Sequence, residues 1–186
     1  IHGSEAIGGV INISTIQDEE DSFLQLAISG GADNFIRESL QKNWKEKNKS
    51  FNILLLNSKT NGFPSLSNSL IDRGYINKSL ISSFDLKGER TNAQFSTWIS
   101  RGDTEYLGFQ GDPLSQNYQN TAYSLEVKRK VRKLNLISLN LSSSKDLIHQ
   151  NQENYLGLKD ITETNSHNLE IMFHKPRNEN SSFAAG

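Results

Sequence analysis

Apolar and polar side chains alternate along most of this sequence, in segments separated by polar or glycine-containing stretches. Successive side chains of a β-strand point to opposite faces, so each such segment presents one apolar face and one polar face. The apolar members of the alternating segments are Leu24, Leu26 and Ile28; Phe51, Ile53 and Leu55; Phe84 and Leu86; Phe95, Thr97 and Ile99; Tyr123, Leu125 and Val127; Ile137, Leu139 and Leu141; and Leu169, Ile171 and Phe173. Leu54 and Leu56 weaken the alternation of the second of these segments. Together with weaker segments at 36–44 and 181–186, they predict an all-β chain of about nine strands, each of roughly 10 residues.

The composition admits a membrane protein only of one kind. With 34% hydrophobic residues and a mean hydropathy of -0.59, the chain contains no run resembling a membrane-spanning helix. A membrane-spanning β-strand needs apolar residues only at every second position, so a mean hydropathy this low is compatible with a transmembrane β-barrel. The net charge of -1 argues against a nucleic-acid surface. The basic run 128–133 is interpreted as a solvated hairpin end, with a phosphate or lipid-headgroup role as the lesser alternative. There are no cysteines, which excludes disulfides and thiolate chemistry.

The spacing of the segments predicts two unequal edges of the sheet. Short turns are expected at 47–49, 88–90, 132–133 and 176–178, and long polar loops at 61–78, 104–120 and 149–164. Outer-membrane barrels have short turns at one rim and long loops at the other. Aromatic residues expected near strand ends suit an interfacial girdle, although they would also close the ends of a soluble sandwich core. They are Trp44, Phe63, Tyr75, Trp98, Tyr106 and Tyr123.

The sequence offers no enzymatic constellation. The four histidines are scattered without metal-ligand spacing, and neither a phosphate-binding loop nor a nucleophile elbow is present. Asp85 and Glu126 are expected on the polar faces of distant strands, where they do not form an acid–base pair. We therefore expect a protein that is not an enzyme and carries no cofactor and no metal.

The first sixteen residues, IHGSEAIGGVINISTI, contain a separate motif. A turn at 2–4 leads into a short apolar strand whose Gly8-Gly9 pair permits close backbone approach. This string resembles the end of the plug domain of TonB-dependent outer-membrane receptors, which runs directly into the first barrel strand. His2 stands where most relatives have an aromatic residue. The matching positions are Gly3, Ser4, Ala6, Ile7, Gly8, Gly9, Val10, Ile11, Asn12, Ile13 and Thr15.

The resemblance implies a domain organisation. Residues 1–16 would be the C-terminal end of the plug, the acidic stretch 17–21 a hinge, and 22–186 the first part of a transmembrane antiparallel β-barrel. Because the sequence lacks an initiator Met and stops inside an alternating segment, we expect a piece of a longer protein. About nine strands do not close a barrel wide enough for a plug, for which roughly 22 are typical.

Later stretches are most similar to the cobalamin-receptor branch of this family. They are the turn at 30–35, Asn61-Gly62-Phe63, and the stretch 73–80, which begins Arg73-Gly74-Tyr75. In receptors of that branch that use calcium, carboxylates stand where this chain has Pro64, Ile71 and Arg73. Only Asp72 remains there, which is too little anionic charge for Ca²⁺, so no calcium site of the family type is expected. Asp103, Glu105 and Asp112 are a weaker substitute, better interpreted as solvated loop charges.

The function that the resemblance implies is TonB-dependent import of cobalamin or a related corrinoid across the outer membrane of a Gram-negative bacterium. The implied partners are TonB with its inner-membrane energising complex, the small-molecule ligand and outer-membrane lipid. Candidate ligand contacts in the long loops are Tyr75, Tyr106, Phe109 and Tyr118, for which ordinary loop aromatics are an equal alternative. The residues expected to line a wet plug–barrel interface are Gln94, Ser96, Ser124, Glu126, Ser138 and Asn140.

Two alternatives stay open. One is a ferric-siderophore or haem receptor of the same superfamily. The other is a non-transporting β-sandwich or adhesin-type binding protein that happens to carry the glycine-rich string.

Overall fold

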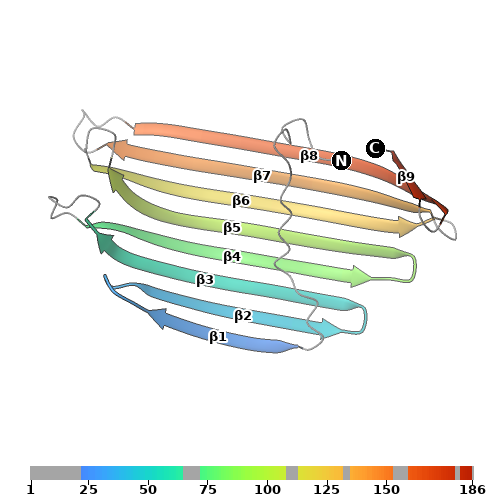
Figure 1. Ribbon diagram of the computed structural model, residues 1–186, viewed down its shortest axis with the longest axis horizontal. Helices are drawn as coiled ribbons and strands as arrows, with labels where there is room; N and C mark the ends of the chain where they lie inside the picture. Colours follow the sequence, from blue (N-terminus) through green and yellow to red (C-terminus); the bar gives the residue numbers. More distant parts are fainter. Residues whose placement is uncertain are drawn as a thin grey trace.

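The computed structural model describes residues 22–64, 72–107, 113–131, 135–152, 159–178 and 181–185. These residues form one antiparallel sheet in which nine strands follow one another in sequence order, each paired with its chain neighbours (Figure 1). The sheet is open, with β1 at one edge and β9 at the other. The strands are β1 (Phe23–Gly30), β2 (Ile36–Glu46), β3 (Lys49–Phe63), β4 (Arg73–Lys87), β5 (Thr91–Leu107), β6 (Pro113–Lys130), β7 (Leu136–Gln152), β8 (Lys159–Asn178) and β9 (Ser181–Ala185).

The strands are longer than the alternation predicts. β5, β6 and β7 have 17, 18 and 17 residues and β8 has 20, so the stretches expected as long loops at 104–120 and 149–164 are mostly strand. The reason is that Asn, Gln, Ser and Thr occupy both faces there, which hides the period of two while the backbone ladder continues. The connections at this edge reduce to 31–35, 64–72, 108–112 and 153–158, opposite the tighter turns at 47–48 and 88–90.

Local backbone geometry fixes the first hairpin. Asp33 and Asn34 both have φ of 54°, and the Phe35 amide donates to the Ala32 carbonyl at 3.0 Å. Positive φ at both central residues is typical of a type I′ turn, whose twist matches that of the flanking strands. The Thr60 hydroxyl and the backbone N–H of Asn61 both donate to the Asp33 backbone carbonyl at 2.9 Å. These two hydrogen bonds connect the turn to the end of β3.

The pairing register sorts the side chains into two faces, called here the apolar face and the polar face. Phe51, Phe84, Phe95, Leu125 and Leu141 are successive partners on the apolar face of β3 to β7. The intervening residues belong to the polar face, where the buried side chains include Ser58, Ser83, Ser100 and Ser138. The predicted opposition of Phe95, Thr97 and Ile99 to Gln94, Ser96 and Ser100 is confirmed.

The band of apolar side chains crosses the sheet obliquely. Leu26, Leu40, Leu55, Leu80 and Ile99 are successive partners in β1 to β5, but the same row continues to Lys145 in β7. Conversely, the row that holds Ile171 in β8 ends at Glu46 in β2. The apolar band thus shifts along the strand direction from one strand to the next. Such a shift is expected where the strands are tilted relative to the direction in which the band runs across the sheet.

The expected aromatic girdle is only partly present. Trp98 lies mid-strand in β5 and not near a strand end, and with Tyr75 and Tyr106 it belongs to the polar face. Trp44 and Tyr123 do lie on the apolar face, both substantially exposed. The prediction failed because proximity to a strand end was judged from alternation, which stops before the strand does. The plug-end motif, Gly3 to Thr15, and the hinge at 17–21 lie outside the described residues.

Candidate functional site

Three of the four candidate ligand-contact tyrosine and phenylalanine residues share one region. Tyr75 of β4, Tyr106 of β5 and Tyr118 of β6 lie on the polar face of adjacent strands, toward the edge with the longer connections. Phe109 lies outside the described residues. The sequence assigned these residues to loops, whereas the structure places them in strands, where the sheet backbone holds their spacing.

Tyr118 lies across the neighbouring strand. Its direct partner in β5 is Gly102, and a Cβ at that position would lie 2.4 Å from the phenol oxygen and 2.6 Å from Cζ. The ring therefore occupies the space that a side chain at residue 102 would need. The phenol also interacts with Ser100, two residues further along β5.

A small polar network lies beneath this tyrosine. The Ser100 hydroxyl, in a residue only 4% exposed, donates to Asn77 Oδ1 at 2.9 Å and lies 3.0 Å from the Ser79 hydroxyl. The Ser79 hydroxyl lies 3.3 Å from the same Asn77 oxygen. Because buried polar groups need partners, this network fixes the Ser100 side chain beside the phenol. The buried network thus supports the Tyr118 ring, and the ring supplies aromatic surface that suits a large ligand with apolar surface.

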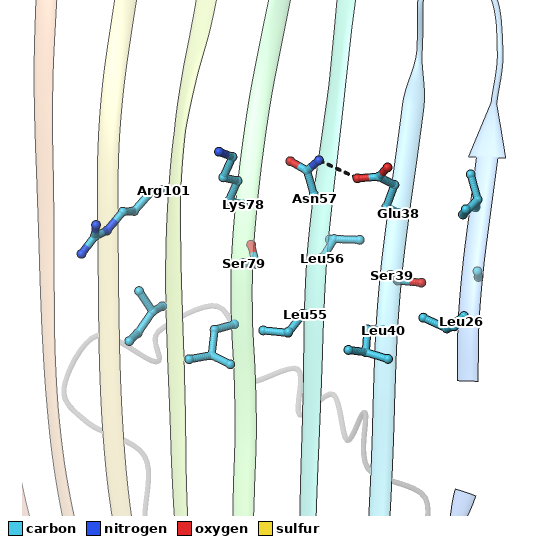
Figure 2. A pocket seen from close by; sticks show the side chains of 14 residues that line it. Leu26, Glu38, Ser39, Leu40, Leu55, Leu56, Asn57, Lys78, Ser79 and Arg101 are labelled. Carbon is cyan, nitrogen blue, oxygen red and sulfur yellow. Dashed lines mark hydrogen bonds between the residues drawn. The ribbon is translucent and has the colours of Figure 1, made fainter. Parts of the chain in front are cut away.

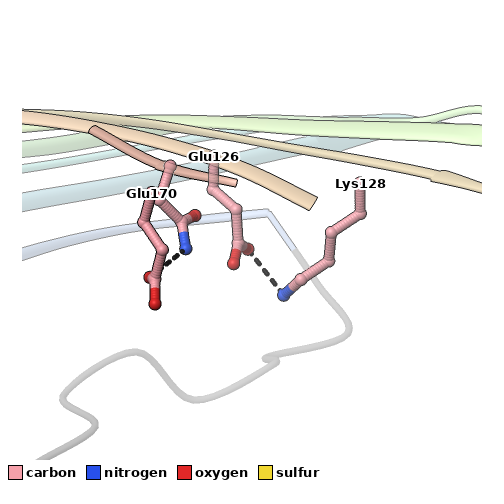
Figure 3. Close-up of polar contacts among 4 residues, drawn as sticks. Glu126, Lys128 and Glu170 are labelled. Carbon is pink, nitrogen blue, oxygen red and sulfur yellow. Dashed lines mark hydrogen bonds and ion pairs between the residues drawn. The ribbon is translucent and has the colours of Figure 1, made fainter. Parts of the chain in front are cut away.

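Nearer the short-turn edge, the polar face carries a row of carboxylates separated by amides. Asp85, Gln94, Glu126, Asn140 and Glu170 are successive partners in β4 to β8. Glu126 pairs with Lys128 at 2.7 Å, and Asn140 donates to Glu170 Oε2 at 3.2 Å (Figure 3). Two strand spacings of roughly 4.8 Å separate neighbouring carboxylates, so the row is too wide for proton sharing. It offers instead a hydrated acidic surface to a polar or cationic partner.

The residues predicted to line a wet interface lie on this same face. Ser96 and Ser124 are direct partners whose hydroxyls lie 2.6 Å apart, one step from Gln94 and Glu126. Ser138 is buried beside Lys128. The structure thus brings together all six predicted residues, although it shows nothing of what faces them.

An apolar row, which the sequence did not reveal, divides the tyrosine region from the acidic row. Leu54, Ile81, Trp98 and Ala122 are successive partners on the polar face of β3 to β6. In the sequence Leu54 and Leu56 interrupt the alternation and only weakened the strand prediction. A stretch that is apolar on both faces is the signal that could have indicated this row.

The described residues contain no group of three or more metal-ligating side chains. Asp103 and Glu105 lie in β5 on the same side as the apolar band; the Asn117 amide donates to Asp103 and the Gly74 amide to Glu105 at 3.2 Å. Asp112 lies outside the described residues. Among the described parts of the chain, no helix is long and apolar enough to cross a bilayer.

No protein-family model matches this chain, and no curated protein is significantly similar to it.

Proposed function

We propose that this chain forms the end of the plug and the first barrel strands of a TonB-dependent outer-membrane receptor, and that the receptor imports cobalamin or a related corrinoid. The observation that carries the proposal is the division of one long-stranded antiparallel meander into an apolar and a polar face. In an outer-membrane barrel, the apolar face would contact lipid and the polar face would line the interior.

The exposure of the apolar face agrees with a lipid environment. Leu26 and Ile28 are 73% and 80% exposed, and Leu114 is the one buried hydrophobic residue among those described. Left in water, this apolar surface would cost about 25 cal/mol per Å². In a bilayer, the same surface is solvated by acyl chains.

The plug-end resemblance of residues 1–16 supplies the second support, since in that family the motif precedes the first barrel strand. The acidic and hydroxyl-rich rows of the polar face would then contact the plug through water, which allows the plug to shift at modest cost. The energy for import would come from TonB and its inner-membrane complex.

The corrinoid is the proposed ligand because the tyrosine region combines aromatic surface with a fixed Ser–Asn network. A ferric-siderophore or haem receptor is the alternative within the superfamily. A non-transporting β-sandwich is the alternative from another class, and it would bury the apolar face beneath a second sheet.

Two measurements on the complete gene product test the proposal in turn. Outer-membrane fractionation with heat-modifiable migration in detergent gels should give a closed barrel, whereas a soluble, heat-insensitive protein would support the sandwich. Calorimetry with cyanocobalamin, with and without a calcium chelator, should then give binding that the chelator does not change. A correctly inserted barrel that does not bind cyanocobalamin would redirect the search to iron chelates and haem.

A further inference from the structure

The apolar face contains a groove with a charged upper rim. The groove, of about 710 Å³, extends over β1 to β5 and is floored by Leu26, Leu40, Leu55, Leu80 and Ile99 (Figure 2). One step toward the edge with the longer connections, the next row of the same face is Glu38, Asn57, Lys78 and Arg101.

The two cations of this rim, Lys78 and Arg101, are placed side by side. Lys78 and Arg101 are direct cross-strand partners, an arrangement of like charges that is unfavourable by itself. Within the described residues, neither side chain forms an ion pair or a side-chain hydrogen bond.

The nearest carboxylates of the same face, Glu38 and Asp103, hydrogen-bond to neutral amides and form no ion pair with Lys78 or Arg101 among the described residues. Glu38 Oε2 accepts from Asn57 Nδ2 at 2.9 Å, and Asp103 accepts from the Asn117 amide. Asn57 stands between Glu38 and Lys78 in the row, so it separates the acid from the base (Figure 2). Lys78 and Arg101 are therefore available to an anionic group from outside the sheet.

We infer that this groove binds a phosphate-bearing lipid of net negative charge, with the headgroup phosphate between Lys78 and Arg101 and an acyl chain along the leucine row. Guanidinium and ammonium groups are strong hydrogen-bond donors to phosphate, and a guanidinium can bind two phosphate oxygens at once. Leu80 and Ile99 lie two residues from the cations, about 7 Å along the strand, so the apolar floor begins where an acyl chain would leave the headgroup.

This inference rests on the proposed function, because it requires the apolar face to lie in a bilayer. It adds to that function a specific lipid contact on the outer surface of the barrel, beside the Lys78–Arg101 pair. A small free anion would not contact the leucine row that floors the groove, whereas the acyl chain of a lipid would, so a lipid is the proposed occupant.

The test uses the complete gene product in detergent, first checked for barrel closure by heat-modifiable migration. Dioleoyl-phosphatidylglycerol and dioleoyl-phosphatidylcholine are titrated separately, and bound lipid is counted by native mass spectrometry. The wild type should prefer the anionic lipid by about tenfold or more, and Lys78→Gln with Arg101→Gln should remove most of that preference. Lys145→Gln is the matched control, since Lys145 is on the same face but pairs with Glu163 at 2.8 Å.

Retention of the preference in Lys145→Gln together with its loss in the double variant supports the site. Equal binding of the two lipids by a closed wild-type barrel, an unchanged preference in the double variant, or an equal loss in Lys145→Gln would overturn it while leaving the transport proposal intact. Competition by millimolar inorganic phosphate that abolishes the lipid preference would also overturn it, in favour of a free-anion site. Failure of the wild type to close as a barrel would overturn the proposed function, and with it the lipid site.

Discussion

The Tyr118 phenol lies over Gly102 of the adjacent strand, at a distance that leaves no room for a Cβ. The same Cβ would also lie 2.2 Å from the Ile76 carbonyl oxygen, which is backbone and does not move aside as a flexible side chain would. Position 102 is therefore restricted to glycine from two sides.

Gly102→Ala is expected to lower stability by about 1–3 kcal/mol, because it overfills the space between β4 and the Tyr118 ring. The measurement is the midpoint of thermal or denaturant unfolding in detergent. Gly30→Ala is the matched control, since a Cβ there would meet only the Phe35 carbonyl oxygen, at 3.8 Å. Equal losses in the two variants would contradict the special role of the close approach.

Tyr118→Ala is expected to weaken corrinoid binding about tenfold or more, because the ring offers aromatic surface on the polar face beside Ser100. Tyr123→Ala is the control, as Tyr123 belongs to the same strand but to the apolar face and is 45% exposed. Calorimetry with cyanocobalamin compares the two. A ligand that bound elsewhere would leave the affinity of the Tyr118 variant unchanged.

Leu55 and Leu56 are consecutive residues on opposite faces, which gives a test of the lipid-facing surface within one strand. Leu55→Arg should destabilise a membrane barrel by about 2–4 kcal/mol if it lies near the bilayer midplane, and Leu56→Arg should cost less. The measurement is the fraction of heat-modifiable barrel in outer-membrane extracts. Equal tolerance of Leu55→Arg and Leu56→Arg would contradict the lipid-facing surface. A sandwich would bury Leu55 and also lose stability, and it is distinguished by migration that heat does not change.

Lys47→Gly is expected to stabilise the β2–β3 hairpin by about 0.5 kcal/mol. Lys47 has φ of 48°, a conformation that costs an L-residue more than glycine, and the gain is reduced by the greater freedom of glycine in the unfolded chain. Lys49→Gly, at the start of β3, should have the opposite sign because glycine weakens strands. Unfolding midpoints of the two variants decide the matter.

The sequence predicted the number of strands and the faces of the clearly alternating segments, because the period of two depends only on neighbouring residues. It missed the strand lengths, since Asn117 and Gln119 extend β6 with polar side chains on the face that is apolar further along the strand, which hides the period of two. The contact between Gly102 and Tyr118 was also not predictable from the sequence. That contact depends on the register between β5 and β6, which no local pattern encodes.

The apolar row through Leu54, Ile81 and Trp98 illustrates the same limit. Each residue was visible as an exception within its own strand, but only the pairing aligned the exceptions into one row. By contrast, Ser96 and Ser124 were assigned to the correct face because both sit within regular alternation.

Among the described residues, every contact between strands joins neighbours in the sequence, so each hairpin of this sheet can form without a strand distant in the sequence. Closing each hairpin costs only the entropy of a short connection, and the β4–β5 pair can form before β8 exists. The same locality makes the sheet modular in evolution. The loss or duplication of two consecutive strands would change the circumference of a barrel while leaving every other register as it is.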